Sequence, residues 1–239
     1  MNESDGAIDR LSGPPTDSEA LCFRSWPCAR CRQGLATISY LIRCQGADPT
    51  FRASSIDEKI EKEVAWLKSW VSTCSHNDKR FWVARLTHGS EHEVYLEQEF
   101  RECVVKLTLP GLYGDQYYLK EGRVFQKACT PYEYLVRLRL WKKIFGFAPE
   151  HVGMLSSGQI VSIQNFVDGE IPSQQQVKDF LRQSGLTPVR ESCWLWKQDD
   201  EVRPVSIWVG DARADNFVAH DGEIIPIDLR LWITPRTSV

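Results

Sequence analysis

The most constraining feature of this sequence is a polar stretch near its C-terminus, V-G-D-A-R-A-D-N-F-V-A-H-D-G-E-I-I-P-I-D-L. In it, Asp211 and Asn216 stand in a D-x-x-x-x-N spacing, and Asp228 follows after two short apolar runs joined by Asp221-Gly222. A D-G pair between two such runs is a strong signal for a tight β-hairpin turn. The sequence therefore predicts a polar loop, a strand, a tight turn, a second strand and a carboxylate at the end of that strand.

Those three side chains are of the types that phosphoryl transfer to a hydroxyl requires. In such a transfer one carboxylate orients the acceptor hydroxyl and takes its proton, while an Asn and a second Asp hold magnesium against the nucleotide phosphates. Magnesium prefers hard oxygen ligands, usually one or two carboxylates together with phosphate oxygens. We therefore predict Asp211 as the catalytic carboxylate and Asn216 and Asp228 as the metal ligands. The alternative is that these residues only close a turn and end a strand.

A β-rich run, R-E-C-V-V-K-L-T-L, places Lys106 within a predicted strand upstream of the polar loop. A Lys at this point of a kinase-type nucleotide-binding sheet pairs with the phosphates, whereas the alternative is a solvent-facing Lys on an edge strand. Residues 81–96 precede it and predict a hairpin whose turn contains Gly89 and Ser90. Their backbone N–H groups are candidates for binding phosphate. Because one glycine stands where protein kinases have three, an ordinary hairpin turn fits equally well.

The segment Thr130-Pro131-Tyr132-Glu133 predicts the start of a helix that ends near Phe145-Gly146. Thr at the N-cap, Pro at the first helical position and Glu at the third form a capping box. Glu133 therefore has two interpretations. It either serves the capping box alone, or it also pairs with Lys106 across the nucleotide site.

Residues 159–169 predict a strand that leads into a Gly-containing link, and Ser173 with Gln176 forms a second capping box for the next helix. In a kinase-type layout this strand leads into the hinge, whose backbone hydrogen-bonds adenine, and Gln164 is our candidate for that contact. The predicted order is thus three strands, a helix, a strand, a hinge, a helix, the polar loop and a hairpin.

Seven short segments in this order resemble the kinase-like domain of bacterial and phage polyvalent proteins, a compact relative of the Ser/Thr/Tyr kinases. They are S-E-H-E-V-Y-L, V-V-K-L-T-L-P-G, T-P-Y-E-Y-L-V-R-L-R-L, I-F-G, Q-N-F-V-D-G-E-I-P, D-A-R-A-D-N-F-V and G-E-I-I-P-I-D-L. More distantly, the chain is similar to aminoglycoside phosphotransferases. The resemblance implies an α+β, protein-kinase-like two-lobed fold and a phosphotransferase that uses ATP and Mg²⁺. It leaves the acceptor open between a protein and a small molecule.

The chain departs from protein kinases at both ends of the polar stretch. Val209-Gly210 stand where protein kinases have His-Arg, and Leu229-Arg230 follow the predicted metal-binding Asp in place of Phe-Gly. Eleven residues follow Asp228 in this 239-residue sequence, too few for an activation loop or a helical substrate-binding lobe. We therefore expect no control by activation-loop phosphorylation, and either a reduced C-lobe or a fragment of a longer protein. A pseudokinase that acts as a nucleotide-binding or interaction module is the alternative function.

A folded unit is predicted to begin near Ser55, where S-I-D-E opens a helix with another capping box. The apolar side of this helix is expected to pack on the N-lobe. We divide the chain into a disordered or poorly structured segment, 1–54, and a compact domain, 55–239. Within the domain we place an N-lobe at about 55–165, a hinge at about 164–172 and a reduced C-lobe at about 173–239.

Composition narrows the partners and the location. Hydrophobic residues make up 42% of the chain and the formal net charge is −3, so there is no basic footprint for nucleic acid. No run approaches the roughly 18 apolar residues of a membrane span. Residues 1–20 are acidic and lack the basic start and apolar core of a secretory signal. We therefore expect a cytoplasmic protein without nucleic-acid or membrane partners.

Four of the eight cysteines cluster before the compact domain, at Cys22, Cys28, Cys31 and Cys44. Cys28 and Cys31 form a C-x-x-C pair, which clasps zinc when a second pair follows at a suitable spacing. Because Cys22 and Cys44 are irregularly placed, we do not expect a zinc site there. The remaining cysteines are expected to be reduced, as is usual in cytosol.

Overall fold

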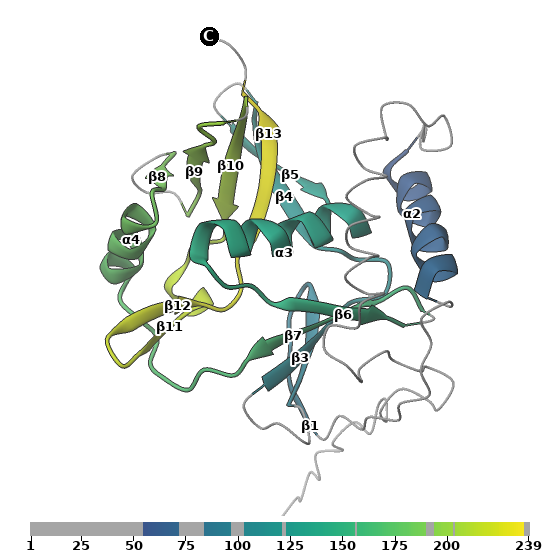
Figure 1. Cartoon of the computed structure of the whole chain (residues 1–239), viewed down its shortest axis with the longest axis horizontal. Coiled ribbons are helices and arrows are strands. Elements are labelled where there is room, and N and C mark those ends of the chain that lie inside the picture. The colour runs from purple at the N-terminus through teal and green to yellow at the C-terminus, as the bar shows by residue number, and fades with distance from the viewer. Residues whose placement is uncertain are drawn as a thin grey trace, which may run out of the picture.

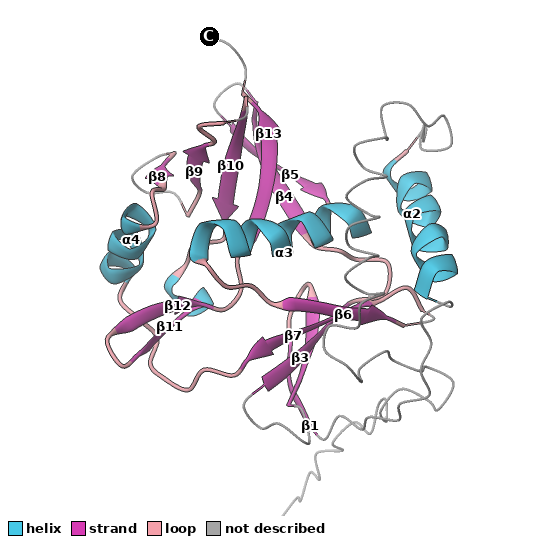
Figure 2. Ribbon diagram, viewed as in Figure 1, coloured by secondary structure: helices cyan, strands magenta, loops and turns pink. Residues whose placement is uncertain are grey.

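The computed structural model of the protein describes residues 55–71, 84–96, 103–120, 123–155, 157–189, 194–202 and 204–236. These ranges contain α-helices, a short 3-10 helix (η3) and antiparallel strands (Figures 1 and 2). The helices are α2 (Ile56–Val71), α3 (Pro131–Phe145), α4 (Gln174–Gln183) and η3 (Ala214–Asn216). The strands are β1 (Ala84–His88), β2 (His92–Leu96), β3 (Cys103–Thr108), β4 (Asp115–Lys120), β5 (Arg123–Ala128), β6 (Glu150–Met154), β7 (Ile160–Asn165), β8 (Thr187–Pro188), β9 (Trp196–Asp199), β10 (Val205–Gly210), β11 (Phe217–His220), β12 (Glu223–Pro226) and β13 (Arg230–Pro235).

A five-stranded antiparallel sheet, in the order β1-β2-β3-β7-β6, holds the predicted lysine on a central strand. In its register Lys106 lies opposite Val94 on β2 and Ser162 on β7. Residues directly opposite each other share a face of a sheet, so Lys106 and Ser162 point to the same side. The other side carries an apolar cluster that includes Val105 and Val161. Lys106 is therefore not on an edge strand.

Helix α3 lies between this sheet and the C-terminal strands (Figure 1). It begins with the predicted capping box between Thr130 and Glu133, and it ends at Gly146 in a left-handed conformation. Its residues Tyr134 and Leu135 belong to one apolar cluster, together with Leu67 of α2. Leu140 and Trp141 belong to a second cluster, with α4 and the C-terminal strands. A single helix thus contributes side chains to two of the three apolar clusters.

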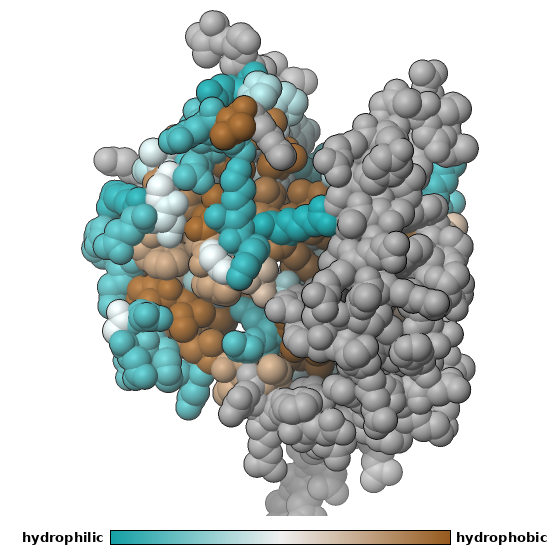
Figure 3. Space-filling model, in the orientation of Figure 1, coloured by the Kyte–Doolittle hydropathy of each residue, from teal (hydrophilic) through white to brown (hydrophobic). Residues whose placement is uncertain are grey.

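The C-terminal part consists of a four-stranded sheet, β13-β10-β9-β8, the hairpin β11–β12 and helix α4. The predicted D-G hairpin is confirmed: Asp221 and Gly222 have φ values of 49° and 82°, as a type I′ turn requires. Helix α4 begins at the predicted Ser173–Gln176 capping box. Figure 3 shows apolar side chains at the surface around β11–β12 and hydrophilic ones over α4.

The mixed α+β class is confirmed, but the predicted element order is incomplete. Between β3 and α3 the structure contains the hairpin β4–β5, which the predicted order lacks. The strands of the C-terminal sheet, β13-β10-β9-β8, are also missing from that order. Every residue of β5 is exposed, so this strand lacks the alternation of apolar and polar residues that would have revealed it. The predicted segment 1–54, with its four cysteines, lies outside the described residues. No described helix is long and apolar enough to cross a membrane.

Candidate active site

The loop after β10 holds Asp211 in an unusual backbone conformation. Its φ is 60°, in the left-handed region that few residues other than Gly adopt and that is enriched at functional sites. The side-chain amide of Asn216 donates a hydrogen bond from Nδ2 to the carbonyl oxygen of Asp211, at 2.7 Å. Because an amide has one nitrogen and one oxygen, this bond leaves Oδ1 of the buried Asn216 as the atom that can accept or coordinate.

The same asparagine connects the loop to the segment after β12. Its backbone oxygen accepts N–H groups from Ile227 at 2.9 Å and from Asp228 at 3.4 Å. From the five-stranded sheet, Nζ of Lys106 donates to the carbonyl oxygen of Ile227 at 2.6 Å. The structure therefore brings together four of the residues that the sequence singled out, Lys106, Asp211, Asn216 and Asp228, from three separate parts of the chain.

Asp228 is the anionic centre of this group. Its side chain keeps a solvent-exposed face, but so many protein atoms surround it that desolvation alone would raise its pKa. The positive charges of Lys106, Arg137 and Arg230 outweigh desolvation, and the pKa of Asp228 is lowered. Asp228 is therefore a carboxylate at neutral pH, in the form that binds a cation.

The carboxylate of Asp211 lies between two arginines. Its Oδ1 accepts a hydrogen bond from Nε of Arg213 at 2.9 Å, and its Oδ2 lies 3.9 Å from Nε of Arg230. Arg213 is largely exposed, with 57% of its side-chain surface accessible, whereas Arg230 retains 14%. One partner is thus an exposed neighbour in the same loop, and the other is a largely buried side chain from the start of β13.

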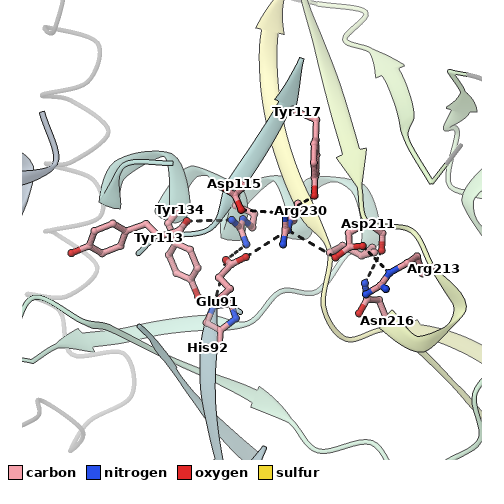
Figure 4. A network of polar contacts seen from close by, with 12 residues as sticks. Glu91, His92, Tyr113, Asp115, Tyr117, Tyr134, Asp211, Arg213, Asn216 and Arg230 are labelled. Atoms are coloured by element: carbon pink, nitrogen blue, oxygen red, sulfur yellow. Dashed lines mark hydrogen bonds and ion pairs between the residues drawn. The ribbon is translucent and has the colours of Figure 1, made fainter. Parts of the chain in front are cut away.

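A buried polar cluster adjoins these residues (Figure 4). Glu91, just before β2, forms a buried ion pair with Arg137 of α3. This pairing contributes to raising the pKa of Arg137, against the effect of its burial. His92 shares a 2.9 Å hydrogen bond with the hydroxyl of Tyr134, and burial lowers the pKa of His92 to about 4. His92 is accordingly neutral at pH 7.

Sequence reasoning missed this cluster, although one signal was present. Arg137 follows Tyr134 by three positions and precedes Trp141 by four, so it stands on the apolar side of α3. A charged residue in an apolar helical stripe is rarely buried without a partner. The position of Arg137 therefore indicated a buried acid, but the local sequence could not identify Glu91 as that acid.

Glu133 and Lys106, which one of the two sequence interpretations paired, have other partners in this structure. Glu133 accepts hydrogen bonds from Thr130 N at 2.9 Å, from Gln116 Nε2 at 2.9 Å and from Lys127 Nζ at 3.2 Å. The first of these closes the capping box. Of the two interpretations offered by the sequence, the capping one describes this structure, because the first turn of α3 faces the β4–β5 hairpin instead of β3.

The predicted nucleotide contacts on the turn and the hinge strand have different surroundings. Gly89 and Ser90 are exposed at the β1–β2 turn, where Gly89 N donates to the His92 carbonyl oxygen at 2.9 Å. A Cβ at Gly89 would approach nothing closer than 3.7 Å, so the protein itself does not require glycine there. Gln164 is buried on β7, and its Oε1 has no hydrogen-bond partner. Buried acceptors are usually paired.

The donor set suits magnesium better than zinc. Among the described residues no three His, Cys, Asp or Glu side chains gather as a metal site. Magnesium in nucleotide enzymes needs fewer protein ligands, because phosphate oxygens and water complete its octahedron. Asn216, with Oδ1 left as acceptor, and the anionic Asp228 provide two hard oxygen ligands. A backbone hydrogen bond from Asp228 N to Asn216 O keeps the two residues together. The residues therefore fit a magnesium–nucleotide complex.

A family model described as a serine/threonine/tyrosine kinase found in polyvalent proteins matches residues 55–235. No curated protein and no solved structure matches the chain. The matched range contains the three apolar clusters, the five-stranded sheet and all the polar residues assembled above.

Proposed function

Because the chain belongs to the serine/threonine/tyrosine kinases found in polyvalent proteins, we propose that it is an active phosphotransferase that uses ATP and Mg²⁺. The resemblance inferred from seven sequence segments is thereby confirmed at the level of the family. The observation that carries the proposal is the convergence of Lys106 and Asn216 on Ile227-Asp228. A cation, two hard oxygen ligands and a candidate base occupy one small region, as phosphoryl transfer needs.

Each residue has a separate role in this proposal. Asn216 and Asp228 hold Mg²⁺, which neutralises charge on the phosphates when it is bound. Lys106, which now donates to a backbone carbonyl oxygen, turns its ammonium group toward the nucleotide phosphates. Asp211 accepts the proton of the acceptor hydroxyl as the oxygen–phosphorus bond forms and the bond to the ADP oxygen breaks. The acceptor, a protein or a small molecule, and a cytoplasmic location stay predictions.

The nucleotide would lie between the five-stranded sheet, as an N-lobe, and the loop after β10, as part of a reduced C-lobe. The side of the sheet that carries Lys106 also carries Gln164, since Val104, two residues before Lys106, lies opposite Gln164. The unpaired Oε1 of Gln164 supports placing the base there. An exocyclic amino group of a base is a donor that this acceptor lacks in the free protein.

A pseudokinase is the second candidate, and three observations favour it. The carboxylate of Asp211 is engaged by Arg213 at 2.9 Å, a contact that competes with an acceptor hydroxyl. The single glycine of the β1–β2 turn and the absence of a Lys106–Glu133 pair point the same way. In that case the fold would bind nucleotide or a protein partner without transferring phosphate.

Thermal unfolding with ATP, with and without Mg²⁺, tests the proposal. At a concentration about 100 times its Kd, a ligand adds about 2.7 kcal/mol of stability, or roughly 5–10 °C for a domain of this size. The proposal predicts that Mg²⁺ enhances this shift, that Asp228→Asn removes the enhancement, and that Lys106→Ala reduces the shift itself. Asp179→Asn on α4, an exposed acid in a surface pair, serves as the control and keeps both effects. Stabilisation by ATP that ignores Mg²⁺ in the unaltered protein would favour the pseudokinase.

A further inference from the structure

A chain of ion pairs runs from helix α3 to the candidate base (Figure 4). Arg137 on α3 pairs with Glu91 in the turn before β2. Oε2 of Glu91 lies 3.8 Å from Nε of Arg230, and the same Nε lies 3.9 Å from Oδ2 of Asp211. Four elements that are distant in sequence are connected through these four charges. Arg230 is the member shared by the two acids.

Three of the four side chains in this chain of ion pairs are largely buried. The side chains of Arg137, Glu91 and Arg230 are 4%, 7% and 14% accessible. Buried charges persist only when they are paired, because desolvation is expensive. The backbone also leaves space for the pair. Gly114 has a φ of 75°, and a Cβ there would lie 2.3 Å from the Glu91 carboxyl group and 2.4 Å from Arg137 Nη2.

Arg230 is also held from its opposite side by the β4–β5 hairpin. Its Nη1 lies 3.4 Å from Oδ2 of Asp115 and donates to the hydroxyl of Tyr117, and its Cζ lies 5.4 Å from the centroid of the Tyr117 ring. A guanidinium is a planar fork with fixed donor directions. Once Nη1 is bound to the hairpin, the direction of the Nε edge is set, and that edge faces Glu91 and Asp211.

This arrangement gives Asp211 one partner from outside its own loop. Arg213 moves with the loop, since it is two residues from Asp211 and mostly exposed. It cannot relate the carboxylate to the sheet or to α3. Arg230 can, because Glu91 precedes β2 of the sheet and pairs with Arg137 of α3. The ion pair between Glu91 and Arg137 also connects α3 to the sheet, a role that one of the two sequence interpretations gave to Glu133 and Lys106.

We propose that Arg230 is the positioning residue for Asp211, and that it transmits the placement of α3 and the β1–β2 turn through Glu91. This inference rests on the proposed phosphotransferase function for its kinetic consequence, but not for the physical link itself. Arg230 touches neither nucleotide nor acceptor in this account. It holds the base at the angle from which the acceptor proton is taken, so its loss should affect turnover more than binding.

The link can be tested without any activity. Glu91→Gln and Asp211→Asn are introduced separately and together. This set of variants is made first with Arg230 present and then in an Arg230→Gln background. Urea unfolding gives the equilibrium constant of each variant. Because both acids share one guanidinium, the effects of the two substitutions should be non-additive by about threefold or more when Arg230 is present. The non-additivity should vanish in the Arg230→Gln background. Additive effects in both backgrounds would overturn the proposed link.

The kinetic consequence is tested on the full chain by ATP turnover and by ATP affinity with Mg²⁺. Arg230→Gln should lower kcat at least about tenfold while the Kd for ATP stays within about threefold. Arg230→Lys should restore part of kcat, and Arg182→Gln on α4, an exposed arginine in a surface pair, should change neither quantity. If kcat per folded molecule is unchanged in Arg230→Gln, Arg230 is structural only and the positioning role is wrong. If the unaltered protein has no turnover, the proposed function fails, and the unfolding cycle still decides the link.

Discussion

Replacing Glu91 with leucine tests how much the free energy of unfolding depends on the buried ion pair between Glu91 and Arg137. Glu91 and Arg137 are 6% and 3% exposed, so Glu91→Leu leaves a guanidinium buried without its carboxylate. The carbonyl oxygen of Tyr113, 3.3 Å from Arg137 Nη2, remains as an acceptor. Breaking a buried pair by removing one partner typically costs 3–5 kcal/mol. Because one acceptor remains, we expect the lower end of that range, about 3 kcal/mol, or roughly 6–12 °C in Tm for a domain of this size.

A compensated variant makes the argument specific. Replacing both members of a buried pair with apolar residues of similar volume is often nearly neutral. The double variant Glu91→Leu/Arg137→Met should therefore recover at least half of the loss, although Arg230 loses its 3.8 Å contact with Glu91. Urea unfolding followed by far-UV circular dichroism measures both variants. A cost below about 1 kcal/mol for Glu91→Leu, or a double variant less stable than the single one, would refute the reasoning.

Three further predictions concern single positions. Gly114→Ala should lower the free energy of unfolding by about 3 kcal/mol or more, because its Cβ would clash with the buried pair. Gly111 has a similar φ of 72° and open space around it, so Gly111→Ala should cost only about 1 kcal/mol. Calorimetry compares the two variants. Burial lowers the pKa of His92 from 6.5 to about 4, so the unfolded state binds its proton more readily, and stability should fall by roughly 3 kcal/mol as pH drops from 6.5 to 4. Urea unfolding at a series of pH values should show a flatter profile in His92→Gln and an unchanged one in the exposed control His220→Gln. Gly89→Ala should leave Tm within about 1 °C, since nothing lies within 3.7 Å of the added methyl group, yet should weaken ATP binding in a titration if the turn approaches the phosphates; unchanged affinity would remove the turn from the site.

The sequence predicted the features that short-range chemistry determines. The capping boxes at Thr130 and Ser173 and the D-G turn at Asp221 each depend on residues at most three positions apart. The polar loop and Lys106 were also singled out by residue type and spacing, and the structure brings them close together. Such local signals predict individual elements well, and they predict which residues lie near one another when these occur in a characteristic order.

The parts that sequence reasoning missed depend on long-range contacts. Glu91 and Arg137 are 46 positions apart, and Arg230 and Asp115 are 115 apart, so nothing local relates them. The β4–β5 hairpin escaped notice because β5 is exposed along its whole length and carries no alternating pattern. Glu133 was open to two interpretations because a capping box and an ion pair use the same residue type. The partners of Glu133 depend on the inserted hairpin, which brings Gln116 and Lys127 to the Glu133 side chain.

The central claim, that this chain transfers phosphate with Asp211 as the base, is tested most directly by one comparison. The rate of phosphate release or transfer from γ-labelled ATP is measured for the unaltered protein and for Asp211→Asn, beside the affinity of each for ATP with Mg²⁺. The account predicts that Asp211→Asn binds ATP within about threefold of the unaltered protein and slows transfer by about 10²-fold or more. Full transfer by Asp211→Asn would contradict it. Joint loss of ATP binding and of magnesium dependence would instead identify Asp211 as a metal ligand and contradict the roles assigned within the site.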